Sequence, residues 1–203
     1  MELLRINNLK IRYKIKSGVI KAVDVDSLVI NEGEMFGLVG ESGCGKSTLA
    51  KSIIRILPPN AYIESGEIRI KGKEISRMPE REFNKLRWKE ISIIPQSAMN
   101  ALDPVYTIRE QIAEAINTHT DKNSTKTNQR IDELMQLVGL KPERADDYPH
   151  EFSGGMRQRA MIAMALALNP SLIIADEPTT VSYTHLRAHE TSLHLVCRLL
   201  LEK

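Results

Sequence analysis

The chain has 203 residues, enough for one domain, and its 28 Lys and Arg side chains nearly balance its 26 Asp and Glu side chains. The resulting formal net charge of +2 disfavours nucleic acid or an anionic membrane as the partner, because such surfaces select strongly basic proteins. Aromatic residues make up only 4% of the chain, which argues against a platform that stacks single-stranded bases.

The cysteine content and the first residues indicate the compartment. Two cysteines, Cys44 and Cys197, cannot form a disulfide framework, so we expect a reducing environment. Residues 1–5 lack the basic-then-apolar pattern of a signal peptide. The most apolar stretch, residues 160–168, is too short to span a bilayer. We therefore expect a soluble intracellular α/β protein.

The first third of the chain predicts strands followed by a loop and a helix. Residues 3–12 and 19–30 roughly alternate apolar and polar side chains, which predicts two half-exposed antiparallel strands. Residues 35–39 form a short apolar run typical of a strand that is buried on both faces. Residues 46–57 have apolar positions at helical spacing, and residues 67–70 predict a further strand.

Further along the chain, the pattern changes from strands to helices and back. Residues 79–88 predict a charged surface helix, and residues 91–94 predict a buried strand. Helical spacing of apolar residues then marks residues 107–147 as a helical insertion between two strand-rich halves. An apolar helix at residues 157–168 and a buried strand at residues 172–175 follow.

Residues 40–47 read GESGCGKS and satisfy the pattern G-x-x-x-x-G-K-[ST] of a phosphate-binding loop. The glycines let backbone N–H groups converge on phosphate oxygens, and the following helix favours an anion at its N-terminus. Lys46 is expected to reach the β- and γ-phosphates, and Ser47 is expected to ligate Mg²⁺. The expected nucleotide contacts in this segment and at the residue after it are Gly40, Ser42, Gly43, Cys44, Gly45, Lys46, Ser47 and Thr48.

Two carboxylates follow the predicted strand at residues 172–175. Ligands of open α/β sheets bind at the carboxyl ends of the strands. Asp176 is therefore placed to hold hydrated Mg²⁺ opposite Ser47, and Glu177 to polarise the attacking water. Considered alone, such residues are more often helix caps or solvated loop residues. The phosphate-binding loop in the same chain favours the catalytic interpretation.

A second glycine-rich segment, residues 152–159 (FSGGMRQR), precedes the apolar helix. Ser153 is expected to be the N-cap, and Gly154 and Gly155 expose backbone donors at a helix N-terminus. The local sequence alone does not distinguish a second phosphate-binding surface from the flexible, capped start of a helix.

The order and spacing of these elements resemble the nucleotide-binding subunit of ATP-binding-cassette (ABC) transporters. Residues 40–47, 95–104 (PQSAMNALDP) and 153–159 (SGGMRQR) are similar to the dipeptide, oligopeptide and nickel importer branch. The resemblance covers one domain, residues 1–180. It implies an α/β fold with a P-loop NTPase (ABC-type ATPase) core, an antiparallel β-subdomain and an α-helical subdomain at about residues 97–160.

The resemblance also implies functions for individual residues. Tyr13 would stack on adenine, and the alternative is an ordinary strand aromatic. Gln96 would contact Mg²⁺ and the attacking water and signal to the membrane subunit, and the alternative is a solvated loop residue. Ser153, Gly154 and Gly155 would bind the γ-phosphate of ATP held by the opposite subunit.

The implied activity is hydrolysis of ATP with Mg²⁺, which would drive uptake of peptides or nickel across the cytoplasmic membrane. The expected catalytic residues are Glu177, Gln96 and Lys46, and the expected metal ligands are Ser47, Gln96 and Asp176. The implied partners are transmembrane permease subunits docked on the helical insertion, a second ATP-binding subunit (identical or a paralogue) and, indirectly, an extracytoplasmic solute-binding protein. The implied location is peripheral, at the cytoplasmic face of the membrane, and no nucleic-acid partner is expected.

The resemblance ends abruptly after residue 180. Relatives continue Ala-Leu-Asp, whereas this chain continues Val181-Ser182-Tyr183. We expect neither the last sheet strands of the family nor its γ-phosphate-binding histidine in the remaining residues. We interpret residues 181–203 as a foreign tail on a C-terminally truncated cassette, from a frameshift, a fusion or adapter sequence. Weak or no hydrolysis is therefore expected from this polypeptide, even where Mg-ATP binds.

Two further features are not expected to have a chemical function. Cys44 occupies a variable position of the phosphate-binding loop, so no catalytic thiol is expected there. His185, His189 and His194 resemble a metal cluster. The zinc pattern H-E-x-x-H, however, needs its second histidine at position 193, which is Leu193.

Two rival functions stay open at this stage. One is a non-transport ABC-type ATPase that acts on DNA or ribosomes. Such relatives carry long coiled coils, zinc modules or a second cassette, whereas the 57 positions from Gln96 to Ser153 leave room for a compact helical subdomain. The other rival is a fragment that binds nucleotide without turnover.

Overall fold

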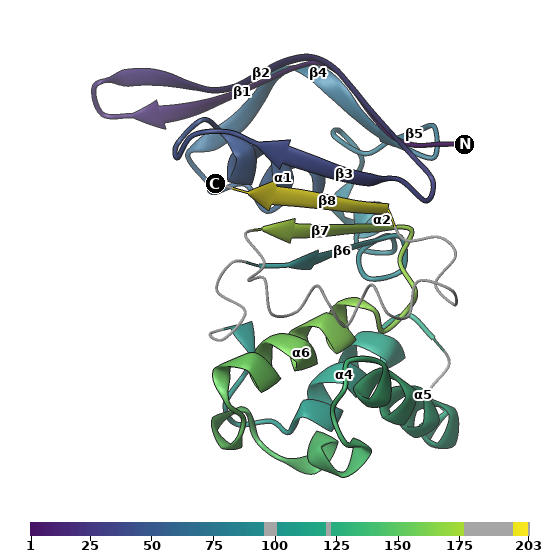
Figure 1. Ribbon diagram of the computed structural model, residues 1–203. Coiled ribbons are helices and arrows are strands. Elements are labelled where there is room, and N and C mark those ends of the chain that lie inside the picture. The colour runs from purple at the N-terminus through teal and green to yellow at the C-terminus, as the bar shows by residue number, and fades with distance from the viewer. Residues whose placement is uncertain (96–100, 121–122, 177–196, 203) are drawn as a thin grey trace.

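Two four-stranded sheets and a layer of helices build the structure (Figure 1). The structure is a computed structural model, and it describes residues 1–95, 101–120, 123–176 and 197–202. In Figure 1 the antiparallel sheet lies at the top, the parallel sheet in the middle and the helical layer at the bottom. The fold is mixed α/β, as the sequence predicts.

The antiparallel sheet has the strand order β2-β1-β4-β5. Its strands are β1 (Glu2–Ile15), β2 (Gly18–Asn31), β4 (Ala61–Ile70) and β5 (Lys73–Glu74). The predicted antiparallel pair is confirmed, and β1 and β2 form a long hairpin. Strand β4 begins at residue 61 rather than 67, because Ala61 and Tyr62 continue the ladder opposite Tyr13 and Arg12. Register shifts between Asn7 and Ile11 of β1 interrupt the alternation on which the sequence prediction relies.

The parallel sheet has the strand order β3-β8-β7-β6. Its strands are β3 (Met35–Val39), β8 (Cys197–Glu202), β7 (Leu172–Asp176) and β6 (Ile91–Ile94). All neighbouring pairs are parallel, so the carboxyl ends of the strands lie at one edge, on the left in Figure 1. The predicted strands at residues 91–94 and 172–175 are confirmed.

The structure corrects two expectations about the parallel sheet. The sequence analysis expects the last sheet strands of the family to be missing and predicts no strand after residue 175, whereas β8 lies between β3 and β7. The run Leu199-Leu200-Leu201 has the continuous apolar character of strands in parallel sheets, which explains this position. The sequence also predicts that β3 is buried on both faces, whereas Met35 is 44% and Val39 is 67% exposed. Strand β3 is an edge strand, so neighbours cover it less than they cover β7.

The helices next to the sheets are shorter than the sequence predicts. Helix α1 (Lys46–Ile53) lies between the two sheets (Figure 1). It ends before residue 57 because Arg55 adopts a left-handed backbone with a φ of 56°. Helix α2 (Glu80–Phe83) is one turn instead of a helix over residues 79–88. The chain then reverses at Trp88, whose N–H donates to the carbonyl of Ile91 in β6.

The helical layer contains three helices and two 3₁₀ turns within the described residues. They are α4 (Ile108–Asn117), α5 (Ser124–Leu137), η1 (Pro142–Asp146), η2 (Pro149–Glu151) and α6 (Gly154–Ala165). Thr107 and Glu110 form a capping box that starts α4. Ser153 is the N-cap of α6, as the sequence predicts, and its hydroxyl accepts a hydrogen bond from the N–H of Met156 at 3.4 Å.

Strand β7 separates two apolar cores, because side chains alternate between the faces of a strand. Ile173 and Ala175 belong to a core that includes Ile112, Leu134 and Ala163 of the helical layer. Leu172 and Ile174 belong to a second core that includes Leu4, Leu49 and Ile53 of the antiparallel sheet and α1. The carboxyl end of β7 is therefore held from both faces.

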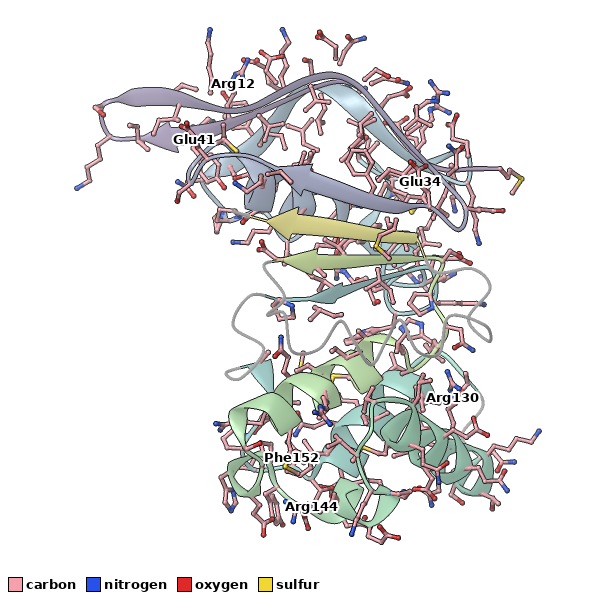
Figure 2. The ribbon with its side chains drawn as sticks, viewed as in Figure 1. Arg12, Glu34, Glu41, Arg130, Arg144 and Phe152 are labelled. Atoms are coloured by element: carbon pink, nitrogen blue, oxygen red, sulfur yellow. The ribbon has the colours of Figure 1, made fainter. Side chains whose placement is uncertain are left out.

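Both ends of α6 are anchored in the helical layer, where Figure 2 shows Arg130, Arg144 and Phe152. The Arg130 guanidinium, from α5, donates to the carbonyls of Leu166 and Ala167, each at 3.2 Å, at the C-terminus of α6. The Arg144 guanidinium lies 5.2 Å from the ring centre of Phe152, which precedes the N-cap of α6. In the described ranges, no helix has the length and apolar character needed to cross a membrane.

Candidate functional site

The loop of residues 40–47 joins the carboxyl end of β3 to the N-terminus of α1. The Lys46 Nζ donates to the carbonyl oxygen of Gly40 at 2.6 Å and to that of Glu41 at 2.8 Å. Lys46 is 8% exposed, and no described carboxylate forms an ion pair with it. An ammonium held by neutral carbonyls can exchange them for the oxygens of an anion. The loop therefore holds a cation ready for a phosphate group.

The N-terminus of α1 adds hydrogen-bond donors to the same loop. Gly45 is the N-cap with a φ of 101°, and the described structure shows neither a side-chain cap nor an acidic residue in the first turn. The first-turn N–H groups are therefore open to an external anion. A Cβ atom at Gly45 would lie 2.3 Å from the carbonyl oxygen of Ala22 in β2. Glycine is required here because β2 passes directly against the loop.

Ser47 and Asp176 meet at the carboxyl edge of the parallel sheet. The Ser47 hydroxyl donates to the carboxylate Oδ1 of Asp176 at 3.1 Å, across 129 positions of sequence. Asp176 is 6% exposed, and none of the described basic residues forms an ion pair with it. Oxygen ligands are the kind that Mg²⁺ prefers, and a buried carboxylate without a cationic partner gains from a nearby cation. This donor pair fits the predicted metal site.

A cavity of about 330 Å³ lies between the β1–β2 hairpin and the loop. Tyr13 lines it, and the Tyr13 hydroxyl lies 3.2 Å from the hydroxyl oxygen of Thr48. Its other lining residues are Ile15, Ile20, Lys21, Ala22, Gly43, Gly45, Lys46, Ser47 and Thr48. The structure thus brings Tyr13 to the phosphate-binding loop.

The sequence analysis missed the part of the cavity wall that β2 supplies. Ile20 pairs directly with Tyr13 across the hairpin, and Lys21 pairs with Arg12. The available signal was the hairpin itself, because the residue paired with Tyr13 lies beside it on the same face. The presence of Tyr13 in the sequence did not by itself indicate that residues of β2 line the same cavity.

The glycine-rich segment at residues 153–155 lies apart from this cavity, at the N-terminus of α6 in the helical layer (Figure 1). Ser153 and Gly155 are exposed, and open space surrounds the position where Gly155 would carry a Cβ. The described hydrogen bonds include none between this segment and the phosphate-binding loop. Its backbone donors are open to a group from outside the chain.

Several predicted site residues lie outside the described part of the chain. Gln96 and Glu177 are among them, as are the tail histidines of the rejected zinc pattern. Cys44 is described and exposed, and its Sγ lies 3.5 Å from the Lys46 Nζ. Of the predicted nucleotide and metal contacts, the described structure thus brings together Tyr13, the loop and Asp176.

Comparison with known proteins gives a family and an expected size. The family model for ABC transporters matches residues 23–180. A probable peptide ABC transporter ATP-binding protein of Sinorhizobium fredii is 44% identical over 181 residues, which cover 88% of this chain and 54% of that protein. The oligopeptide transport ATP-binding protein OppD of Bacillus subtilis is 42% identical over 181 residues, which cover 88% of this chain and 51% of that protein. The chain spans about half the length of the curated relatives it matches.

Solved structures with the same fold are ATP-binding cassettes. The dimeric structure of a cassette in a post-hydrolysis state, bound to ADP and Pi, has a TM-score of 0.87 and 25% identity, and the match covers 99% of this chain and 88% of that chain. A dimeric bacterial ABC transporter cassette has a TM-score of 0.84 and 25% identity, and the match covers 98% of this chain and 88% of that chain. These matches and the names of the relatives give no support to the rival function on DNA or ribosomes.

Proposed function

The chain belongs to the ABC transporter family, and from this premise we propose that it is the ATP-binding subunit of a peptide importer, in which hydrolysis of ATP drives uptake. The names of its relatives, which are peptide and oligopeptide transport proteins, support peptides as the solute. Nickel is the alternative solute from the sequence resemblance. The observation that carries the proposal is the convergence of Lys46, Ser47 and Asp176 at one edge of the parallel sheet.

We propose that the triphosphate binds in the loop of residues 40–47. Lys46 would leave the carbonyls of Gly40 and Glu41 and donate to the β- and γ-phosphates, while the first-turn N–H groups of α1 bind the same phosphates. These contacts hold the γ-phosphate in one orientation, which lowers the entropic part of the barrier to attack by water.

Ser47 and Asp176 are the residues that would hold Mg²⁺, Asp176 through ligand water, because their oxygen atoms already lie 3.1 Å apart. When bound, Mg²⁺ would neutralise the negative charge that develops on the phosphate oxygens. Gln96 and Glu177 lie outside the described residues. We propose, from the family resemblance, that Glu177 polarises the attacking water and that Gln96 contacts it.

A second cassette, identical or a paralogue, would complete the site. Ser153, Gly154 and Gly155 would bind the γ-phosphate of the nucleotide held by that second subunit. The exposed N-terminus of α6 and its separation from the chain's own loop support this arrangement. Both solved structures named above are dimers, which supports a cassette pair.

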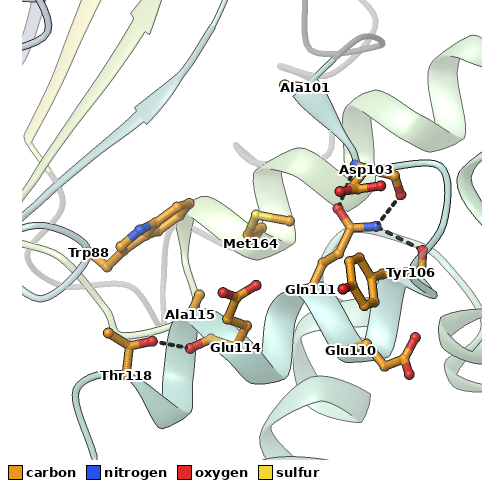
Figure 3. Close-up of a pocket in the computed structure, with 10 residues that line it drawn as sticks. All are labelled: Trp88, Ala101, Asp103, Tyr106, Glu110, Gln111, Glu114, Ala115, Thr118 and Met164. Atoms are coloured by element: carbon orange, nitrogen blue, oxygen red, sulfur yellow. Dashed lines mark hydrogen bonds between the residues drawn. The ribbon is translucent and has the colours of Figure 1, made fainter.

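A groove lined by α4, by Met164 of α6 and by Trp88 is the site that we propose for the transmembrane permease (Figure 3). Its volume is about 740 Å³. Trp88, Ala115 and Met164 form an apolar floor, and Met164 and Ala115 are each 8% exposed. Glu110 and Glu114 on α4 are exposed along its side. An apolar floor beside acidic side chains fits an amphipathic permease segment that carries basic residues.

Hydrogen bonds hold one end of this groove in shape. The Gln111 Nε2 donates to the carbonyl oxygens of Asp103 at 2.9 Å and Tyr106 at 3.0 Å, and the Gln111 Oε1 accepts from the N–H of Asp103 at 2.9 Å (Figure 3). The segment of residues 103–106 is thereby fixed to α4. This contact supports a preformed binding surface, which lowers the entropic cost of docking. The chain would then be peripheral, at the cytoplasmic face of the membrane, with a solute-binding protein acting on the far side.

Nucleotide titration tests the enzymatic part of the proposal. Lys46→Ala should abolish ATP binding measured by calorimetry, because it removes the cation that contacts the phosphates. Lys51→Ala is the matched control, since Lys51 lies in the last turn of the same helix and its loss changes the net charge equally. Equal binding by both variants would refute the proposed site. ATP turnover of the 203-residue chain, measured with phosphate release, tests the expectation of weak hydrolysis.

Co-purification tests the transport part. A transporter subunit should purify with polytopic membrane proteins, whereas the rival function predicts DNA or ribosomes. Glu114→Lys should disrupt the membrane association, because it reverses a charge in the groove. Glu143→Lys, an exposed position on η1 outside the groove, is the matched control. Loss of membrane association in both variants or in neither would argue against the groove as the docking site.

A further inference from the structure

A pocket at the C-terminus of α4 has charged side chains that are all basic among the described residues. Its volume is about 660 Å³. It is lined by Lys85, Lys89, Thr118, His119 and Thr120. Residues 40–48 are not part of this lining, so the pocket is separate from the phosphate-binding loop. Thr118 also lines the groove of Figure 3, so the two surfaces adjoin each other.

Two segments distant in sequence meet at this pocket. The lysines lie between α2 and β6, in a turn where Trp88 has a left-handed backbone with a φ of 63°. The N–H of Trp88 donates to the carbonyl of Ile91 at 2.8 Å, which closes this turn. His119 follows the last turn of α4, and its N–H donates to the carbonyl of Ile116 at 3.1 Å. Backbone hydrogen bonds thus hold both segments that carry the basic side chains.

Neither lysine has an anionic partner in the part of the chain that the structure describes. The ammonium groups of Lys85 and Lys89 form neither an ion pair nor a hydrogen bond there. The adjacent carboxylate, Glu90, accepts hydrogen bonds from the Lys71 Nζ and from the Ser171 hydroxyl, each at 2.8 Å. The described side chains therefore leave the positive charge of the pocket without a counter-charge.

The lysines are also not needed to cap α4. The C-terminus of a helix leaves carbonyl groups to which cations often bind. Here the Thr118 hydroxyl donates to the carbonyl of Glu114 at 2.7 Å (Figure 3), and the Thr120 hydroxyl donates to that of Ile116 at 2.9 Å. Because the threonines bind these carbonyls, the basic side chains stay available to a ligand.

The pKa of His119 depends on the charge of this pocket. Burial and the Lys89 ammonium lower the pKa of His119 below its usual value of 6.5, because both disfavour the protonated ring. Lys85 and Lys89 are the other charged groups of the described lining. The neutral ring offers one N–H donor and the protonated ring offers two. An anion beside the ring would therefore favour its protonated form.

We propose that Lys85, Lys89 and His119 bind a phosphate group at the C-terminal end of α4. A phosphate monoester has three acceptor oxygens and nearly two negative charges at neutral pH, whereas a carboxylate has two oxygens and one charge. Three donors from two segments match the phosphate better. Lysine binds phosphate as a point charge, so flexible ammonium groups suit this ligand. The pocket is larger than a phosphate ion, so the group can belong to a soluble phosphate ester or to a lipid headgroup.

NMR titration of the His119 ring in the 203-residue chain tests the inference. The ring signal is assigned by its loss in His119→Asn. We expect inorganic phosphate to raise the pKa of His119 by about 0.5 relative to sodium chloride at equal ionic strength. The double variant Lys85→Gln, Lys89→Gln should bind phosphate about tenfold more weakly at this pocket. Lys141→Gln is the matched control, because Lys141 is an exposed lysine outside the pocket, and it should leave the binding unchanged.

Two further measurements distinguish the sources of the phosphate group. Flotation with vesicles of phosphatidylglycerol and phosphatidylcholine, compared with phosphatidylcholine alone, tests the lipid headgroup, and titration with glycerol 3-phosphate tests a soluble ester. When inorganic phosphate raises the pKa, vesicle binding that the double variant loses assigns the site to lipid. Binding of the ester without vesicle binding assigns it to a soluble ligand. Both outcomes support the inference.

Other outcomes would overturn it. Phosphate and chloride could change the pKa of His119 equally, or Lys141→Gln could weaken phosphate binding as much as the double variant. Either result would show that the pocket has no specific phosphate site. The ring signal of His119 reports on this pocket and not on the loop at Lys46, so the proposed nucleotide site would be unaffected.

Discussion

Replacing Gly45 by alanine should destabilise the protein more than the same change at Gly43, although both glycines lie in the phosphate-binding loop. Gly45 has a φ of 101° and Gly43 a φ of 83°, so an alanine at either position adopts a backbone conformation that L-residues disfavour. The surroundings differ. A Cβ at Gly45 would lie 2.3 Å from the carbonyl oxygen of Ala22, whereas nothing lies within 4 Å of a Cβ at Gly43.

The expected magnitudes follow from these two contributions. The left-handed backbone alone costs about 1–2 kcal/mol, which is the full effect expected for Gly43→Ala. At Gly45 the clashing atom belongs to the backbone of β2 and cannot rotate away, so the loop or the hairpin must shift. The added cost of such overpacking brings Gly45→Ala to about 3 kcal/mol or more. For a chain of this size, 1 kcal/mol corresponds to a change in Tm of about 2–4 °C.

Thermal unfolding followed by circular dichroism measures both variants against the parent chain. We expect a Tm lowered by about 2–8 °C for Gly43→Ala and by about 6–12 °C for Gly45→Ala. Gly155→Ala serves as a control, since its φ is not in the left-handed range and nothing lies within 4 Å of its Cβ. If Gly45→Ala were no less stable than Gly43→Ala, the close approach of β2 to the loop would be refuted.

Three further predictions concern the metal site, the helical layer and a surface ion pair. Asp176→Asn should weaken ATP binding in the presence of Mg²⁺ by about tenfold or more, because it removes the charge that favours the metal, and should leave Mg²⁺-free binding unchanged in calorimetry. Arg130→Ala should lower the free energy of unfolding by about 1–3 kcal/mol in urea titration, since the carbonyls at the end of α6 lose their donor. Hydrogen bonds from Arg69 and Asn7 lower the pKa of Glu67 from its usual 4.5 to about 2. A lowered pKa stabilises the fold above the unfolded-state value, so the advantage of the parent chain over Glu67→Gln should be constant above about pH 4.5 and shrink toward pH 2 in urea titrations.

The chemistry of the phosphate-binding site could be predicted because it depends on local sequence. The spacing of glycines before Lys46 and Ser47 specifies a strand, a loop and a helix start within a few residues. Even the contact between Ser47 and Asp176, 129 positions apart, follows from a general rule. Asp176 ends β7, and Ser47 lies in the first turn of the helix that follows β3, while the carboxyl ends of β3 and β7 share an edge of one parallel sheet. The capped start of α6 at Ser153 is local in the same way.

The lengths and positions of some strands could not be predicted, because they depend on partners that are distant in sequence. The first residues of β4 have no strong strand pattern, and they are extended because they pair with β1. The exposure of Met35 and Val39 depends on the place of β3 at the edge of its sheet, and the insertion of β8 beside it is a property of the whole sheet. A periodic pattern records which faces of a segment are apolar, but it does not record which neighbour lies there.

The sequence alone predicts the residues that would contact the phosphates and the metal, since backbone conformation and side-chain chemistry in that loop are set by near neighbours. Only the tertiary structure shows which segments form the cavity beside this loop and the groove of the helical layer. The hairpin that carries Ile15 and Ile20 reaches the cavity because β2 passes against Gly45, and the groove at Trp88 and Glu114 forms because α4 packs beside α6. Both surfaces form where segments distant in sequence are brought together by the packing of apolar cores. This packing depends on the whole chain rather than on any one segment of it.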